Sequence, residues 1–214
     1  MRYSPHAAAL LCSVMATAAL AADLSVTVSD ASGSPIQGAV VMASAPGQAP
    51  EASAKAVSID QMNREFVPFL SVVPVGTRIA FPNSDNIRHH VYSFSEAKRF
   101  EIPLYAGDAT APEILVDQAG VIALGCNVHD WMRAYVVVSD TPHTAQSDER
   151  GRVLLTVPAG EYTLRVWHPS VRDDEAGMSV PITVPDAGLE KSLSLADQPR
   201  WRAWRAPSAF EEDY

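Results

Sequence analysis

The feature that most constrains the fold is a long series of short strand-like runs separated by glycine, proline and asparagine turns. In the first run Leu24, Val26 and Val28 alternate with small polar residues, and this period of two is typical of a strand with one buried face. Further strands are expected at 39–43, 66–73, 76–81, 91–94, 114–116, 121–125, 134–138, 153–157, 162–167, 178–184 and 189–195. Because no amphipathic helix of useful length interrupts them, the runs predict an all-β sandwich or barrel.

The N-terminal segment 1–22 has the pattern of a secretory signal peptide. It combines Arg2, an apolar stretch too short to span a bilayer comfortably, and a small-x-small cleavage site at 19–21. We therefore expect a periplasmic protein, cut after Ala21 or Ala22, with no membrane span in its mature form. Cleavage removes Cys12 and leaves Cys126 as the single cysteine. A lone thiol in an oxidising compartment is a liability unless something occupies it.

The composition is that of a globular protein, with 47% hydrophobic and 19% charged residues among 214. The formal net charge of −9 argues against a nucleic-acid partner, because binding nucleic acid requires a basic surface. An acidic surface of this kind could steer a basic protein partner, although net charge alone identifies none.

The residues that carry chemistry form a C-x-x-H-x-x-M string, with Cys126, His129 and Met132 at intervals of three. A second imidazole lies upstream at His89 or His90. These two are neighbours, so on a strand they point to opposite faces and only one is expected to face a metal. Two imidazoles, one thiolate and a weak axial thioether are the ligands of a blue-copper site.

A structural interpretation of the same residues makes Cys126 and Met132 core residues and His129 a loop residue. The remaining histidines of the mature chain, His143 and His168, lie outside the pattern and are expected to be surface or locally hydrogen-bonded groups. Asn83 or Asn86 could brace the ligand loops by hydrogen bonds.

Motifs around these residues carry a family resemblance. A proline-bearing strand at 66–68 precedes a Val-x-x-Gly-x-x-Ile-x-Phe segment at 73–81, an Asn-x-Asp turn at 83–85 and a His-x-Val match at 89–91. The stretch 66–138 thereby resembles a small cupredoxin of the plastocyanin, amicyanin and pseudoazurin type. The resemblance implies a Greek-key β-sandwich with one type 1 copper, and it selects His89 with Cys126, His129 and Met132 as the ligands. The same pattern favours Asn83 over Asn86 as the residue that braces the ligand loops. The ligand loop departs from amicyanin-like loops in having Asn127, Asp130 and Trp131.

The whole arrangement is similar to exported proteins known as methylamine utilization proteins of plastocyanin-like type. The rest of the mature chain resembles a carboxypeptidase-regulatory, or transthyretin-like, β-sandwich, on the segments 148–164 and 26–43. We expect a signal peptide at 1–22, an N-terminal β-hairpin at 23–50, a cupredoxin domain at 56–138, an accessory β domain at 141–196 and a tail at 197–214. The hairpin could belong to the accessory sandwich or supply the first cupredoxin strands.

The resemblance implies a monomeric carrier that shuttles single electrons, with a c-type cytochrome or a dehydrogenase as redox partner. Its electron would leave through the edge of His129, with Val128 and Trp131 in an apolar docking patch. An alternative is a periplasmic protein that binds and delivers copper without carrying electrons. A third possibility is a binding module with a vestigial metal site. An enzyme is not expected, because the sequence shows no second metal cluster and no nucleophile-elbow string.

Overall fold

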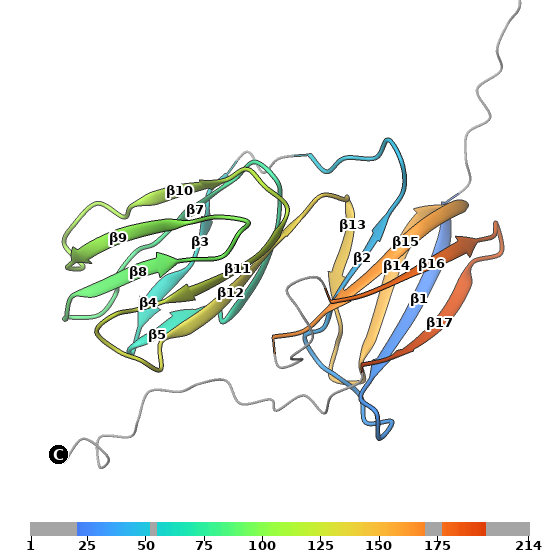
Figure 1. The fold of residues 1–214 in the computed structure, drawn as a ribbon, viewed down its shortest axis with the longest axis horizontal. Coiled ribbons are helices and arrows are strands. Elements are labelled where there is room, and N and C mark those ends of the chain that lie inside the picture. The colour runs from blue at the N-terminus through green and yellow to red at the C-terminus, as the bar shows by residue number, and fades with distance from the viewer. Residues whose placement is uncertain (1–20, 52–54, 170–176, 196–214) are drawn as a thin grey trace, which may run out of the picture.

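The computed structural model describes residues 21–51, 55–169 and 177–195 of the chain (Figure 1). This part is built from strands and turns, with no helix in the described ranges, so the all-β prediction is confirmed. Of the expected signal peptide, only 21–22 are described, and they open the first strand. The expected tail at 197–214 lies outside the described residues. None of the described segments forms a helix long and apolar enough to cross a membrane.

One β-sandwich is built from strands at the beginning and at the end of the described chain. Its first sheet has the order β14-β1-β17 and its second the order β13-β2-β15-β16. The strands are β1 (Ala21–Ser29), β2 (Val40–Ser44), β13 (His143–Gln146), β14 (Arg152–Pro158), β15 (Gly160–Trp167), β16 (Met178–Val184) and β17 (Leu189–Ser194). Leu24, Val26 and Val28 are fully buried and share one apolar cluster with strands of both sheets. The alternation of β1 therefore faces the core as the sequence predicts.

The expected N-terminal hairpin is wrong in one respect, because β1 and β2 do not pair with each other. β1 pairs with β14 and β17, while β2 pairs with β13 and β15 in the opposite sheet. After β1 the Asp30 carboxylate accepts hydrogen bonds from the backbone N–H groups of Ser32 and Ser34, which forms a tight local turn. The chain then continues across the sandwich. Turn residues between two strands indicate a reversal, but they do not say which strand lies alongside.

A second sandwich holds the central part of the chain. Its sheets have the orders β6-β12-β11-β8-β9 and β10-β7-β3, and one apolar cluster joins them. The strands are β3 (Val57–Ser58), β6 (Leu70–Pro74), β7 (Thr77–Ala80), β8 (His89–Ser93), β9 (Phe100–Tyr105), β10 (Glu113–Val116), β11 (Gly120–Gly125) and β12 (Arg133–Ser139). A separate two-stranded sheet pairs β4 (Asp60–Met62) with β5 (Glu65–Val67). The sequence did not predict β3, β4, β9 or β13.

The outer faces of the two sandwiches also pack against each other. Val40 and Met42 of β2 and Trp167 of β15 form an apolar cluster with Val137 of β12. The Trp167 ring lies 5.4 Å from the ring of Tyr135, measured between centroids. β12 therefore buries both of its faces: Ala134, Val136 and Val138 belong to its own core and Val137 to this interface. This double burial explains its nearly continuous apolar sequence.

Candidate metal centre

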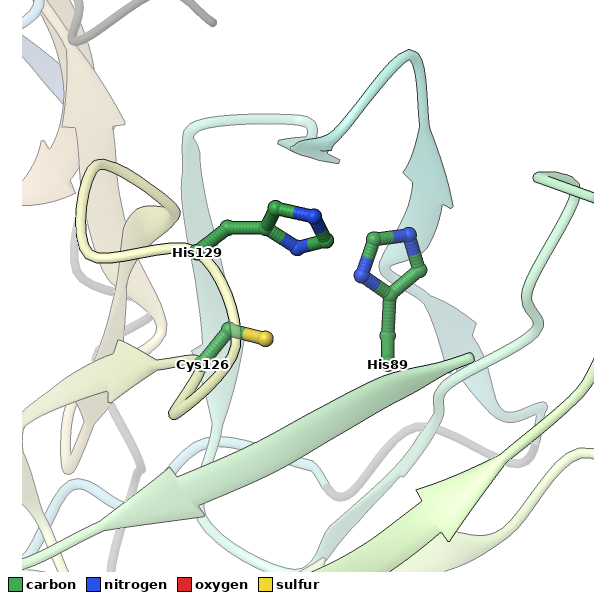
Figure 2. Close-up of side chains that lie close together, drawn as sticks. All are labelled: His89, Cys126 and His129. Atoms are coloured by element: carbon green, nitrogen blue, oxygen red, sulfur yellow. The ribbon is translucent and has the colours of Figure 1, made fainter. Parts of the chain in front are cut away.

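The histidine and cysteine residues predicted as ligands converge at one end of the second sandwich (Figure 2). His89 is the first residue of β8, Cys126 directly follows β11, and His129 lies in the connection to β12. One ligand atom from each residue lies within 4.8 Å of the others. The β11–β12 turn thus brings two of the three groups from one short loop, and the sheet brings the third from a neighbouring strand.

The Nδ1 atoms of the two histidines are available to bind a metal. Figure 2 shows the two imidazoles turned toward the Cys126 sulfur, with 5.0 Å between their centroids. The Nδ1 atoms of His89 and His129 are buried, and neither has a hydrogen-bond partner among the described residues. Buried polar atoms without a partner are costly, so such a pair calls for an explanation. A metal ion held between Cys126 and the two Nδ1 atoms would satisfy both, and a thiolate with two imidazoles suits copper.

The thiol of Cys126 is prepared to act as a thiolate. Burial by itself would raise its pKa, but the His89 side chain and the backbone N–H groups of His90, Val128 and His129 outweigh that effect and hold the pKa below its usual value. Cys126 is 3% exposed, and it is the one free cysteine among the described residues. The thiolate is the form that binds metals.

Asp85 orients His89, and this is the functional residue that the sequence analysis missed. Its Oδ2 lies 2.7 Å from Nε2 of His89. Because a carboxylate accepts, Nε2 carries a proton, and Nδ1 is the nitrogen that faces the site. Burial by itself would lower the pKa of His89, yet its interactions with Cys126 and Asp85 outweigh burial and raise it. The only sequence signal was an acidic residue in the turn before the histidines, which gives no direction for its side chain.

Asn83 braces the loop that carries Asp85 and His89, as the sequence analysis expected. Its side-chain amide donates to the carbonyl oxygens of Ile87 at 2.9 Å and Tyr105 at 3.1 Å. Its Oδ1 accepts the backbone N–H of Asp85 at 3.0 Å. These bonds fix the path of the chain from the turn to the first ligand.

His129 is held from the other side by Trp131. The two rings lie 5.1 Å apart, and the indole Nε1–H donates to the backbone oxygen of Arg64 at 3.1 Å. Burial, followed by the positive charges of His89 and Arg64, lowers the pKa of His129. Trp131 is half-buried, whereas Val128 is 50% exposed beside His129. Of the two expected patch residues, Val128 therefore presents the larger free surface and Trp131 supports a ligand.

The other predicted residues have separate places. Met132 is buried in the same apolar cluster as Cys126, and its backbone N–H donates to the His129 carbonyl at 3.0 Å. His90 lies outside the group, and its Nε2 is 2.9 Å from a carboxylate oxygen of Glu101.

The other two histidines lie in the first sandwich. His143 packs edge-on to the Tyr162 ring, and Nε2 of His168 donates to the Gln37 carbonyl at 3.1 Å.

The fold and the site together define an all-β protein in which one sandwich carries a buried His–Cys–His group at its end. No protein-family model matches the chain. No curated protein matches it either.

Solved structures that resemble the chain include cupredoxins and a copper enzyme. A purple cupredoxin from Nitrosopumilus maritimus is 24% identical over 39% of this chain and 99% of its own, with a TM-score of 0.35. A reduced variant of amicyanin is 19% identical over 46% of this chain and 98% of its own, with a TM-score of 0.37. A copper-containing nitrite reductase from Thermus scotoductus is 22% identical over 46% of this chain but 25% of its own, with a TM-score of 0.38. Because these sequence identities and TM-scores are low, the evidence for the chemistry of the site comes from the residues of this chain.

Proposed function

We propose that the protein is a periplasmic blue (type 1) copper protein that passes single electrons between redox partners. The observation that carries the proposal is the pair of buried, unpartnered Nδ1 atoms on His89 and His129, which face the sulfur of the free Cys126. A soft thiolate with two imidazoles accommodates both Cu(I) and Cu(II). The signal-peptide pattern at 1–22 supports the periplasmic location.

In this proposal Met132 supplies a weak axial thioether from the end of the ligand loop. It lies in the same apolar cluster as Cys126 and directly precedes β12, so its position is fixed by the core. Copper bound there would supply reversible one-electron chemistry. With four protein donors around one ion, no position is left for a substrate, which favours a carrier over an enzyme.

The exit for the electron would be the His129 edge of the site. His129 is half-buried, while His89 is fully buried behind Asp85. Val128 next to it is 50% exposed and would form part of a small apolar contact. Transient redox contacts are small, and an acidic chain favours a basic partner such as a c-type cytochrome. The resemblance to methylamine utilization proteins adds a dehydrogenase as a possible electron donor.

The visible spectrum of the mature protein loaded with Cu(II) tests the proposal. We expect an intense thiolate-to-copper absorption that disappears in Cys126→Ser. His90→Ala is the matched control, because it removes the neighbouring imidazole and should leave the absorption in place. A bound but colourless copper would contradict the electron carrier and favour the delivery protein. Failure of the folded protein to retain any copper would exclude both.

A further inference from the structure

The β4–β5 hairpin forms a two-stranded sheet of its own, and its turn has an uncommon backbone. The two turn residues, Asn63 and Arg64, have φ angles of 56° and 60°. Two-residue hairpin turns with positive φ favour glycine at the second position, and arginine there is disfavoured. A residue kept in such a conformation suggests that the surrounding contacts require it.

The N–H groups of this turn converge on the carboxylate that orients the first histidine. The backbone N–H of Asn63 donates to Oδ1 of Asp85 at 2.6 Å, and that of Arg64 donates to Oδ2 at 2.8 Å. The same Oδ2 lies 2.7 Å from Nε2 of His89. The left-handed conformation of both turn residues is what aims two successive N–H groups at one acceptor.

The Arg64 carbonyl group of the turn binds a residue that lies beside the second histidine. Arg64 accepts the indole N–H of Trp131 at 3.1 Å, and the Trp131 ring lies 5.1 Å from that of His129. The turn is therefore the shared partner of two residues, Asp85 and Trp131, that each contact one histidine of the site. A continuous path of contacts runs from His89 through the turn to His129.

The hairpin is itself fixed to the loop before His89. The backbone N–H of Gln61 donates to the Pro82 carbonyl at 3.1 Å, and that of Ser84 donates to the Gln61 carbonyl at 2.9 Å. The Ser84 hydroxyl donates to Asp60 at 2.7 Å. These bonds limit movement of the turn relative to the ligand loop.

We propose that the Asn63–Arg64 turn is a positioning element that couples the two histidines of the site, through Asp85 to His89 and through Trp131 to His129. The effect of the turn on copper affinity rests on the proposed function. The coupling itself is a property of the metal-free protein. Groups that orient metal ligands commonly change metal affinity by about 10- to 100-fold when they are removed.

The coupling is tested first without metal, by amide and indole hydrogen exchange followed by NMR. Asp85→Ala should accelerate exchange of the Asn63 and Arg64 amides and, although Asp85 does not touch it, also exchange of the Trp131 indole N–H. Arg64→Gly keeps both backbone groups and tolerates the positive φ, so it should preserve slow exchange at the turn. Glu113→Ala, an exposed carboxylate on β10, controls for loss of charge. If the Trp131 indole is unaffected in a folded Asp85→Ala protein, the proposal is wrong.

A double-mutant cycle on Cu(II) affinity tests the consequence. Asp85→Ala and Trp131→Phe, which keeps a ring beside His129 but removes the indole donor, should each weaken binding by about tenfold. If the turn couples the two contacts, the double variant should lose much less than the product of the two single losses. If all three variants fold and the two single losses in Cu(II) affinity simply multiply, the proposed coupling is wrong. Absence of copper binding by the unmodified protein would instead contradict the proposed function and leave the exchange experiment to decide the coupling.

Discussion

Nε2 of His89 lies 2.7 Å from Oδ2 of Asp85, a carboxylate only four residues earlier in the chain. This contact fixes the proton of the imidazole on the side away from Cys126 and leaves Nδ1 facing the thiol. The carboxylate is itself held ionised. Burial would raise the pKa of Asp85, but the Arg64 N–H, His89 and the Asn63 N–H outweigh it and lower that pKa. Contacts within the protein thus set the orientation of the His89 ring before any metal arrives.

Asp85→Asn keeps the size of the side chain and removes its charge. Because the amide accepts more weakly and cannot favour one tautomer of His89 as the carboxylate does, we expect Cu(II) affinity to fall by about tenfold or more. Competition titration against a chelator of known affinity measures this change. An affinity equal to that of the unmodified protein would show that the tautomer of His89 is set by other contacts.

Met132→Leu tests the proposed axial thioether. Leucine has nearly the same volume, so the cost in the free energy of unfolding should stay below about 1.5 kcal/mol. We expect the blue absorption to persist and the reduction potential to rise, because removing an axial donor withdraws stabilisation from Cu(II) more than from Cu(I). Redox titration gives the potential. If it does not move, Met132 is a core residue and not a ligand.

His168 makes stability depend on pH. Burial lowers its pKa to about 4, against the opposing effect of its bond to the Gln37 carbonyl. The unfolded chain binds the proton near pH 6.5, so the contribution of His168 is fully present above that pH and is lost as the pH falls toward 4. The corresponding decrease in the free energy of unfolding is roughly 3 kcal/mol.

Urea unfolding of the unmodified protein and His168→Gln at several pH values between 4 and 7.5 isolates this contribution. The glutamine amide can still donate to Gln37, but it does not titrate. The difference between the two proteins should therefore shrink or reverse in favour of the variant as the pH is lowered. A difference that is constant with pH would contradict the assignment.

Trp167→Ala tests the interface between the sandwiches. The ring is 7% exposed and packs with Val40, Met42 and Val137. We expect the free energy of unfolding to fall by about 3–5 kcal/mol, since an aromatic side chain is removed from a packed cluster. Leu154→Ala, at a position 65% exposed on β14, is the control and should change it by about 0.5 kcal/mol or less. A similarly small effect of Trp167→Ala would mean that the two sandwiches are held together by other contacts.

The sequence by itself determined what short-range spacing can encode. The alternation of Leu24, Val26 and Val28 correctly predicted a strand with one buried face. The C-x-x-H-x-x-M spacing placed Cys126 and His129 in one turn between two strands, where a short loop brings both to a common point. An upstream histidine was expected to join them, and the structure brings His89 there.

Only the tertiary structure decided which segments meet. It placed β1 and β2 in opposite sheets and brought the Asn63–Arg64 turn to Asp85 and Trp131, which are 21 and 67 residues from Arg64 in the chain. The strands β4 and β5 have three residues each, too few to show a period. Partner choice depends on pairing and packing between distant segments, and hydrogen bonds such as that of Trp131 use backbone groups that every residue possesses. A local pattern of side chains therefore cannot predict these long-range contacts.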